Sequence, residues 1–205
     1  MALAVVFVAA MQATLPVDFR LTEQSHYAFT AVLGVLLLVL IIGDPGRIDR
    51  DRRWLRVVTG VLFGVITLAA GAAAIRLVAG ILAQAEFASA QQLLAIGGVV
   101  WLTNVIGFAL WFWDLDDGGA PSRAARGSTR NQAFLFPEME VPDRVAAGWY
   151  PRFIDYLALS FYTALAFGPA DVSPLRPWAK LAMICEALIS LVLAALVLAR
   201  AINVL

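Results

Sequence analysis

The sequence predicts an all-α, polytopic membrane helical bundle of about six spans, with five spans plus a re-entrant segment as the alternative. Of the 205 residues, 61% are hydrophobic and only 15% are charged, whereas soluble domains are about 45–50% apolar and about 25% charged. The mean hydropathy is +0.82. The apolar residues also form long blocks between short polar segments. This pattern is typical of helices that each cross a hydrocarbon core of about 30 Å with about 20 residues.

The composition excludes several classes of protein. The formal net charge is zero, so nucleic acid is not an expected partner. The single cysteine, Cys185, cannot form an intrachain disulfide. The single histidine, His26, has no partner histidine or cysteine, so we expect no structural metal site. The sequence offers neither a nucleophile–base pair nor a glycine-rich phosphate loop, which predicts a protein that is not an enzyme and needs no cofactor.

The apolar blocks divide a single integral-membrane domain, residues 1–205, into six expected spans. In chain order these are 1–16, 27–43, 57–82, 93–113, 153–170 and 181–202. The first block is short for a span, and a signal peptide is the competing interpretation. A signal peptide normally begins with a basic region, but no Lys or Arg precedes Arg20. We therefore expect a short first transmembrane helix.

The third and fourth expected spans contain two polar residues and one pair of glycines. Arg76 is an intramembrane charge and hence a functional candidate, although its side chain can also extend to the membrane surface about one helix length from Arg56. Asn104 lies in mid-span, where an amide is expected to hydrogen-bond to another helix. Gly60 and Gly64 share one helix face, which would let a neighbouring helix approach closely.

The segment 114–152 is the longest polar stretch, and we expect it to be a cytoplasmic loop. Asp114, Asp116 and Asp117 carry the carboxylates that a divalent cation prefers, but their spacing does not match the EF-hand loop. An acidic turn at a helix exit is the better interpretation. The later FLFPEMEVP stretch is apolar enough to lie on the membrane surface or against the bundle.

The distribution of Lys and Arg predicts the orientation, because cytoplasmic loops carry an excess of these residues. With six spans and a cytoplasmic N-terminus, eleven Lys and Arg residues lie inside and four lie outside or at the outer interface. The four are Arg20, Arg76, Arg176 and Lys180. We therefore expect a multi-pass cell-membrane protein whose N- and C-termini are both cytoplasmic.

The stretch from Tyr156 onward combines a helical run, a Gly-Pro break, an acid and a final apolar helix. Its notable residues are Ser160, Phe161 and Thr163, then Ala166-Phe167-Gly168-Pro169-Ala170, then Asp171, Pro174, Glu186 and Ala199-Arg200. This stretch resembles the pore region of two-transmembrane potassium channels, which has a pore helix, a T-V-G-Y-G-D filter, a following proline and an inner helix that often holds a glutamate. The resemblance covers less than a quarter of the chain. It implies a homo-oligomer that conducts a monovalent cation along Thr163, Phe167, Gly168, Asp171 and Glu186.

The filter part of this stretch is degenerate. A potassium filter stacks backbone carbonyls and a threonine hydroxyl in place of the water shell of the ion. Here only Gly168 is kept of the two glycines, Ala166 supplies no hydroxyl, and Pro169 restricts φ and removes a donor. We therefore do not expect potassium selectivity by the usual route.

A second resemblance covers most of the chain. The segments FALWFWDLDDGGAP, FLFP and TALAFGPADVSPL resemble those of uncharacterised bacterial polytopic membrane proteins. This resemblance implies a bacterial-type inner membrane but no established activity.

Two functions follow from these patterns, and both have the lipid bilayer as a partner. The first is an ion-conducting or ion-translocating protein, in which Glu186 and Asp171 belong to the path, since embedded carboxylates mark such paths. The alternative is a non-conducting scaffold or accessory subunit of a membrane complex, in which Glu186 only hydrogen-bonds to a neighbouring helix. Asp155 either pairs with Arg152 or caps the start of a helix.

Overall fold

The computed structural model is an all-α bundle, which confirms the expected fold class. It describes residues 1–16, 26–43, 53–83, 89–119, 123, 132–166 and 171–204. The main helices are α1 (Ala2–Thr14), α2 (His26–Gly43), α3 (Arg53–Leu82), α4 (Ala90–Leu115), α7 (Phe153–Ala166) and α8 (Pro177–Val204). The short elements are η2 (Asp116–Gly118), β1 (Phe134–Leu135), α6 (Pro137–Glu140), η3 (Pro142–Arg144) and β2 (Ser173–Pro174).

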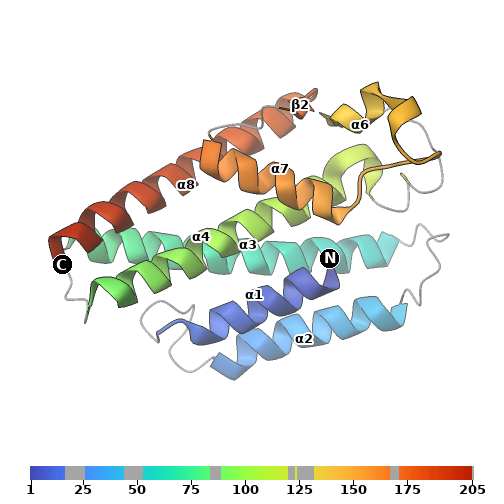
Figure 1. Ribbon diagram of the computed structural model, residues 1–205. Coiled ribbons are helices and arrows are strands. Elements are labelled where there is room, and N and C mark those ends of the chain that lie inside the picture. The colour runs from blue at the N-terminus through green and yellow to red at the C-terminus, as the bar shows by residue number, and fades with distance from the viewer. Residues whose placement is uncertain are drawn as a thin grey trace.

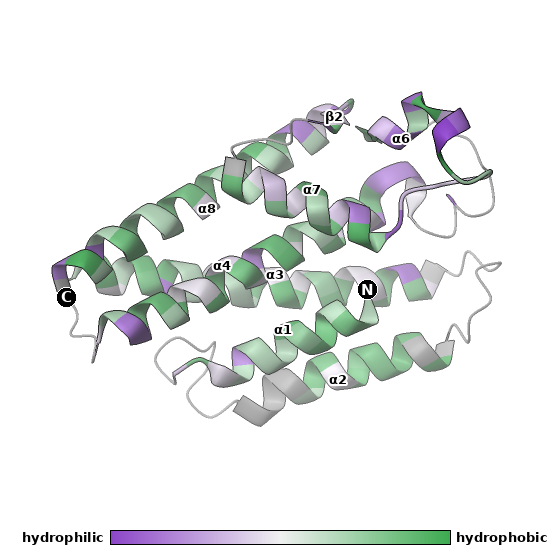
Figure 2. Ribbon diagram, viewed as in Figure 1, coloured by the Kyte–Doolittle hydropathy of each residue, from purple (hydrophilic) through white to green (hydrophobic). Residues whose placement is uncertain are grey.

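Within the described ranges, three helices are long and apolar enough to cross a membrane, namely Trp54–Leu82, Ala90–Gly118 and Pro177–Asn203. The outer surface of the bundle carries large apolar side chains, and Leu68, Ile75 and Ile202 are each 71% exposed. Hydrophobic residues cover most of the main helices, and hydrophilic residues gather near α6 and at helix ends (Figure 2). A surface of this kind suits a lipid environment, because a soluble protein rarely exposes such large apolar patches.

Helix α4 is the centre of the bundle and packs against α3, α7 and α8. The pair α1 and α2 lies on one side of α3 and α4, and the pair α7 and α8 lies on the other (Figure 1). One glycine explains how closely α4 and α8 approach. A Cβ atom added at Gly97 would lie 2.7 Å from a methyl group of Val197. By contrast, Cβ atoms at Gly60 and Gly64 would meet no atom within 4 Å among the described residues, so the close contact expected there is absent.

Helices α7 and α8 begin at the same end of the bundle. Strand β1 precedes α7 and strand β2 precedes α8, and the two pair antiparallel with Phe134 opposite Pro174. The N–H of Leu175 donates to the carbonyl of Ala133 at 2.7 Å, and the rings of Phe134 and Trp178 lie 5.9 Å apart. We call this end of the bundle the cap end, and the opposite end, where α8 finishes, the far end (Figure 1).

Helix α7 is only half as long as α8. It has 14 residues against 28, or about 21 Å against about 42 Å at 1.5 Å per residue. Its Phe161 packs against Trp101 in the middle of α4, with ring centroids 5.6 Å apart. Residues 167–170 lie outside the described part of the chain, and Ser173 is again at the cap end. The crossing expected for residues 153–170 and its alternative, a re-entrant segment, both stay predictions.

Candidate functional site

A line of buried polar side chains runs where α4, α7 and α8 meet, and we call it the polar seam. Its members are Asn104 of α4, Ser160 and Thr163 of α7, and Glu186 and Ser190 of α8. All five are buried, whereas the outer faces of the same helices are apolar. The bundle is therefore polar inside and apolar outside along this junction, which marks the seam as a candidate site.

Glu186 is the only carboxylate of the seam, and its side chain is 0% exposed. Its Oε1 atom is hydrogen-bonded to the hydroxyl of Ser160. That hydroxyl also lies 2.7 Å from the main-chain carbonyl oxygen of Val105 on α4. The other carboxylate oxygen, Oε2, is buried and has no hydrogen-bond partner among the described residues. Ser160 of α7 thus connects α4 with α8, and the Oε2 atom of Glu186 is left without a hydrogen-bond partner in the described structure.

Asn104 forms the second link of the polar seam. Its side-chain N–H donates to the hydroxyl oxygen of Ser190 at 3.3 Å. Ser190 lies one helical turn beyond Glu186 on the same face of α8. This is the interhelical hydrogen bond that the sequence predicts for an amide in mid-span. The bond adds a second polar link between α4 and α8, one helical turn farther from the cap end than Glu186.

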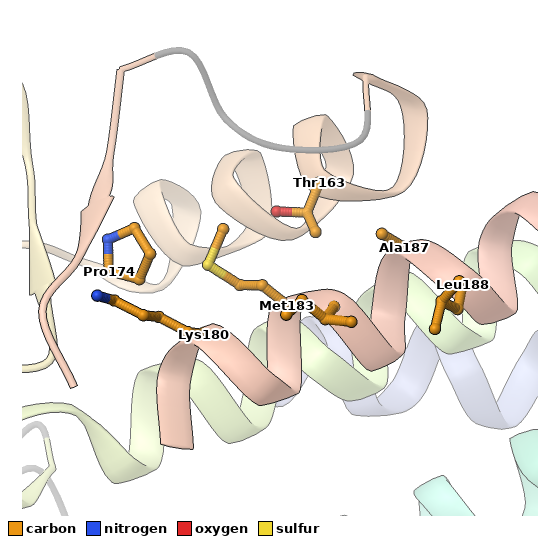
Figure 3. A pocket seen from close by; sticks show the side chains of 7 residues that line it. Thr163, Pro174, Lys180, Met183, Ala187 and Leu188 are labelled. Carbon is orange, nitrogen blue, oxygen red and sulfur yellow. The ribbon is translucent and has the colours of Figure 1, made fainter. Parts of the chain in front are cut away.

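Thr163 lies where the polar seam meets a pocket between α7 and α8. The pocket has a volume of about 300 Å³. It is lined by Thr163, Pro174, Lys180, Met183, Ile184, Ala187 and Leu188 (Figure 3). The hydroxyl of Thr163 donates to the carbonyl of Leu159 one turn earlier at 2.8 Å. The pocket is mainly apolar, with the charged Lys180 toward the cap end.

The remaining site residues expected from the sequence do not join the seam. Asp171 is exposed and lies two residues before β2, and Arg76 is exposed on α3. The carboxylate of Asp155 accepts a hydrogen bond from the N–H of Arg152 at 2.7 Å, which caps the start of α7 as one of the two expected roles requires. Phe167 and Gly168 lie outside the described residues. The structure therefore brings together Thr163, Glu186 and Asn104 of the expected set.

A second polar cluster, which no sequence pattern predicted, lies at the cap end. Asp116 is fully buried. One of its carboxylate oxygens accepts from the N–H of Ala133 at 2.6 Å, and the other accepts from the hydroxyl of Tyr156 at 2.5 Å. Arg123 is also buried; it donates to the main-chain oxygen of Asp116 at 2.5 Å. Its guanidinium lies 5.0 Å from the centre of the Tyr156 ring, a distance at which a cation is attracted to an aromatic face.

Aromatic side chains surround this cluster and exclude water from it. The ring of Phe134 lies 5.1 Å from that of Phe112 and 6.2 Å from that of Tyr156, both edge-on. Phe136 packs edge-on against Tyr156 at 5.2 Å. Such edge-to-face pairs stabilise beyond the area that they bury. The cluster fixes the starts of α7 and α8 to the end of α4, so it positions the polar seam.

The acidic turn after α4 does not form a metal site in the described structure. No group of three or more His, Cys, Asp or Glu residues that could hold a metal ion occurs among the described residues. Both carboxylate oxygens of Asp116 are engaged by Ala133 and Tyr156. Asp117 adopts a left-handed backbone conformation with φ of 49°, as a residue in a tight helix exit does. A structural turn is thus the role that the geometry supports for these acids.

Comparison of the chain with protein-family models, with curated proteins and with solved structures finds no match. The geometry of the polar seam and of the cap end is therefore the basis for the function proposed below.

Proposed function

We propose that this protein is an integral membrane protein that translocates a monovalent cation, and that its path lies along α7, α8 and the polar seam. The observation that carries the proposal is the half-length helix α7, whose Ser160 contacts the buried carboxylate of Glu186 and whose described part ends less than two turns later, at Ala166. The last main-chain carbonyls of a helix have no intrahelical partner, and inside a membrane they must be satisfied by other groups. A helix that enters from the cap end and ends halfway is therefore unusual unless those carbonyls bind something.

The end of α7 provides an environment that favours a cation. The C-terminal end of a helix carries a partial negative charge from its unpaired carbonyls. Half-helix ends of this kind coordinate cations near the middle of the membrane in transporters. Thr163 lies in the last turn of α7 and lines the pocket, and Glu186 adds a carboxylate at a similar depth of α8. Both features support the ion path that the resemblance to potassium channels implies.

The geometry also favours a revised topology, with five spans and a re-entrant α7. If α7 returns to the cap end, α8 crosses the membrane and the C-terminus lies opposite the N-terminus. The segments on the cap side then contain twelve of the fifteen Lys and Arg residues. These are Arg47, Arg50, Arg52, Arg53, Arg56, Arg123, Arg126, Arg130, Arg144, Arg152, Arg176 and Lys180. The positive-inside rule therefore places the cap end and the N-terminus in the cytoplasm of a bacterial-type inner membrane, and the C-terminus outside.

The far half of the junction is closed by apolar side chains. Leu93 and Ile96 of α4 pack with Leu193, Val197 and Ala201 of α8 in one buried cluster. A single copy of the chain in this conformation thus presents no polar route from Ser190 to the far end among its described residues. Translocation then requires a rearrangement of α8 or a path between copies in a homo-oligomer, as the resemblance implies.

Flux measurements on the purified protein in liposomes test this function. We expect cation flux from the wild-type protein and a strong reduction in the Glu186→Gln variant. A smaller reduction is expected for Asp171→Asn, because Asp171 is exposed near the cap end. Glu140→Gln is the matched control, since Glu140 is exposed on α6 and distant from the seam. Absence of cation flux from the wild-type protein as well as from the three variants would overturn the proposal.

A non-conducting scaffold or accessory subunit is the second candidate. One observation favours it: the bonds Asn104–Ser190 and Ser160–Glu186 link three helices, as purely structural hydrogen bonds would. Under this alternative the liposomes stay sealed, and a stoichiometric membrane partner co-purifies with the intact bundle. Apolar replacement of a link that only fastens helices would then lower the stability of the bundle, and no transport would be lost because none occurs.

A further inference from the structure

We infer that the species bound at Glu186 is a proton, held between its carboxyl group and the Ser160 hydroxyl, and that this proton is exchanged with the cap side. The inference rests on the proposed function and names its cargo. Three features of the seam support it. The Ser160 hydroxyl has one hydrogen but contacts two acceptors, no cation is paired with Glu186 among the described residues, and few oxygens contact Glu186.

The hydrogen count at Ser160 favours a proton on Glu186. A serine hydroxyl has one hydrogen to donate, yet its oxygen lies within hydrogen-bond distance of two acceptors, the Val105 carbonyl and Glu186 Oε1. A carbonyl and an ionised carboxylate can only accept. Both contacts are satisfied together when Ser160 donates to Val105 and a protonated Glu186 donates to Ser160.

Among the residues that the structure describes, no charged group is paired with the carboxyl group of Glu186. Its Oε1 contacts Ser160 of α7, and its Oε2 has no hydrogen-bond partner in the described part of the chain. From α4 the neighbouring polar groups are Asn104 and the carbonyl of Val105, which are neutral. On α8 itself Lys180 lines the pocket toward the cap end. A buried carboxyl without a paired cation is stable in its neutral form, because burying an unpaired charge is very unfavourable.

The other ionisable groups near the seam are engaged at the cap end. Tyr156 lies one turn before Ser160 on α7, and its hydroxyl donates to the carboxylate of Asp116. Asp155 accepts from the N–H of Arg152 at the first turn of α7. Cys185, beside Glu186 in sequence, is exposed on the outer face. Tyr156 and Asp155 are hydrogen-bonded to other groups, and Cys185 is exposed, so none of the three places a charge beside Glu186.

A proton fits this site better than an alkali cation does. An alkali cation needs a ring of oxygens to replace its water shell. In the described structure, the one hydrogen-bond partner of the Glu186 carboxyl group is the Ser160 hydroxyl, which also contacts the Val105 carbonyl, and the side chain is fully enclosed. A proton needs only one donor–acceptor pair, which Glu186 and Ser160 provide.

The exchange has a simple balance. When Glu186 gives its proton to water that enters from the cap side, Glu186 becomes a carboxylate and the water a hydronium ion, and the Ser160 hydroxyl rotates its single hydrogen from Val105 to Glu186 Oε1. When the proton returns, the hydroxyl rotates back. Thr163 lies one turn beyond Ser160 on α7 and lines the pocket between α7 and α8, so this pocket adjoins the seam.

Infrared spectroscopy and flux measurements on the full-length protein in liposomes test the inference together. At neutral pH we expect the C=O stretching band of a protonated carboxylic acid. The band should disappear in Glu186→Gln, shift in Ser160→Ala and stay unchanged in Glu140→Gln. A pH-sensitive dye inside the liposomes should report proton flux that Glu186→Gln reduces at least tenfold, while potassium flux stays at background.

Four results would count against the inference, and they differ in what they leave standing. If the band is missing, or survives in Glu186→Gln, Glu186 does not hold the proton. If potassium passes and protons do not, the cargo is wrong but the proposed cation translocation stands. If neither ion passes, the proposed function fails as well. Retention of the band in a folded Ser160→Ala variant, unshifted, would show that Ser160 does not share the proton.

Discussion

The hydroxyl of Tyr156 donates a hydrogen bond to the buried carboxylate of Asp116 at 2.5 Å, across 40 residues of sequence. The second oxygen of the same carboxylate accepts from the N–H of Ala133 at 2.6 Å. One side chain at the end of α4 therefore holds both the start of β1 and the first turns of α7. Because β1 pairs with β2, the same bond also fixes where α8 begins.

Loss of this bond should weaken the bundle. In Tyr156→Phe, a carboxylate oxygen of Asp116 is left buried without its donor. Such a loss typically lowers the free energy of unfolding by about 1–3 kcal/mol. Thermal or denaturant unfolding of the purified protein measures the effect. The control is Tyr162→Phe, since Tyr162 is also on α7 but is 53% exposed; equal stability of the two variants would contradict the role given to Asp116.

The fold class and the main helices could be predicted because hydrophobicity is a local property. The blocks at 57–82 and 93–113 lie within α3 and α4, and each helix extends beyond its block by a few polar or interfacial residues. The polar cluster of Asp116, Tyr156 and Arg123 at the cap end could not be predicted. Its acid, Asp116, lies in a run of three similar aspartates, and nothing local distinguishes the one that meets Tyr156. Which of the three aspartates is buried depends on where Ala133 and Tyr156 pack against the end of α4. The hydrophobic periodicity of the sequence carries no information on that packing.

The contact of Gly97 with Val197 gives a second expectation. A Cβ atom at position 97 would lie 2.7 Å from a methyl group of Val197, and β-branched valine has little rotamer freedom in a helix. Overpacking of this kind destabilises by about 1–3 kcal/mol. We expect Gly97→Ala to lower the unfolding temperature and Val197→Ala to restore it in the double variant.

The adjacent glycine is the control for this substitution. A Cβ atom at Gly98 would meet nothing within 4 Å of described structure, so Gly98→Ala should leave stability unchanged or slightly raised. The GxxxG pair at Gly60 and Gly64 should behave in the same way. If Gly97→Ala and Gly98→Ala had equal effects, the close approach of α4 and α8 at this position would be wrong.

The path of α7 gives a topological expectation. We replace Cys185 by Ser, introduce single cysteines, and label intact cells with a membrane-impermeant reagent. Asp143→Cys and Asp171→Cys, both at exposed positions near the cap end, should be protected in intact cells. Ser89→Cys and Asn203→Cys, exposed at the far end, should be labelled. Labelling of positions 143 and 171 from opposite sides would mean that 153–170 crosses the membrane.

The sequence identified individual members of the seam but not their association. Asn104 and Glu186 are conspicuous as polar residues in apolar blocks, and Thr163 stood out through the resemblance to a pore helix. Ser190 carried no signal, since a serine in a transmembrane helix is common. The pairing of Ser160 with Glu186 depends on α7 lying parallel to α8. In the six-span prediction, the segments 153–170 and 181–202 run antiparallel, so the Lys and Arg distribution did not predict this pairing.

An apolar replacement of Glu186 separates a structural role from a functional one. A buried carboxyl with one oxygen unpartnered in the described structure is costly, because a polar group without a hydrogen bond loses about 1–3 kcal/mol relative to water. Methionine has a similar volume, and in Glu186→Met the Ser160 hydroxyl keeps its bond to Val105. We expect this variant to unfold at the same or a higher temperature than the wild type, and to transport nothing. A large loss of stability would instead show that Glu186 fastens the helices, as a scaffold requires. Asn104→Leu is the matched comparison: Asn104 already donates to Ser190, so its replacement should lower stability whichever function is correct.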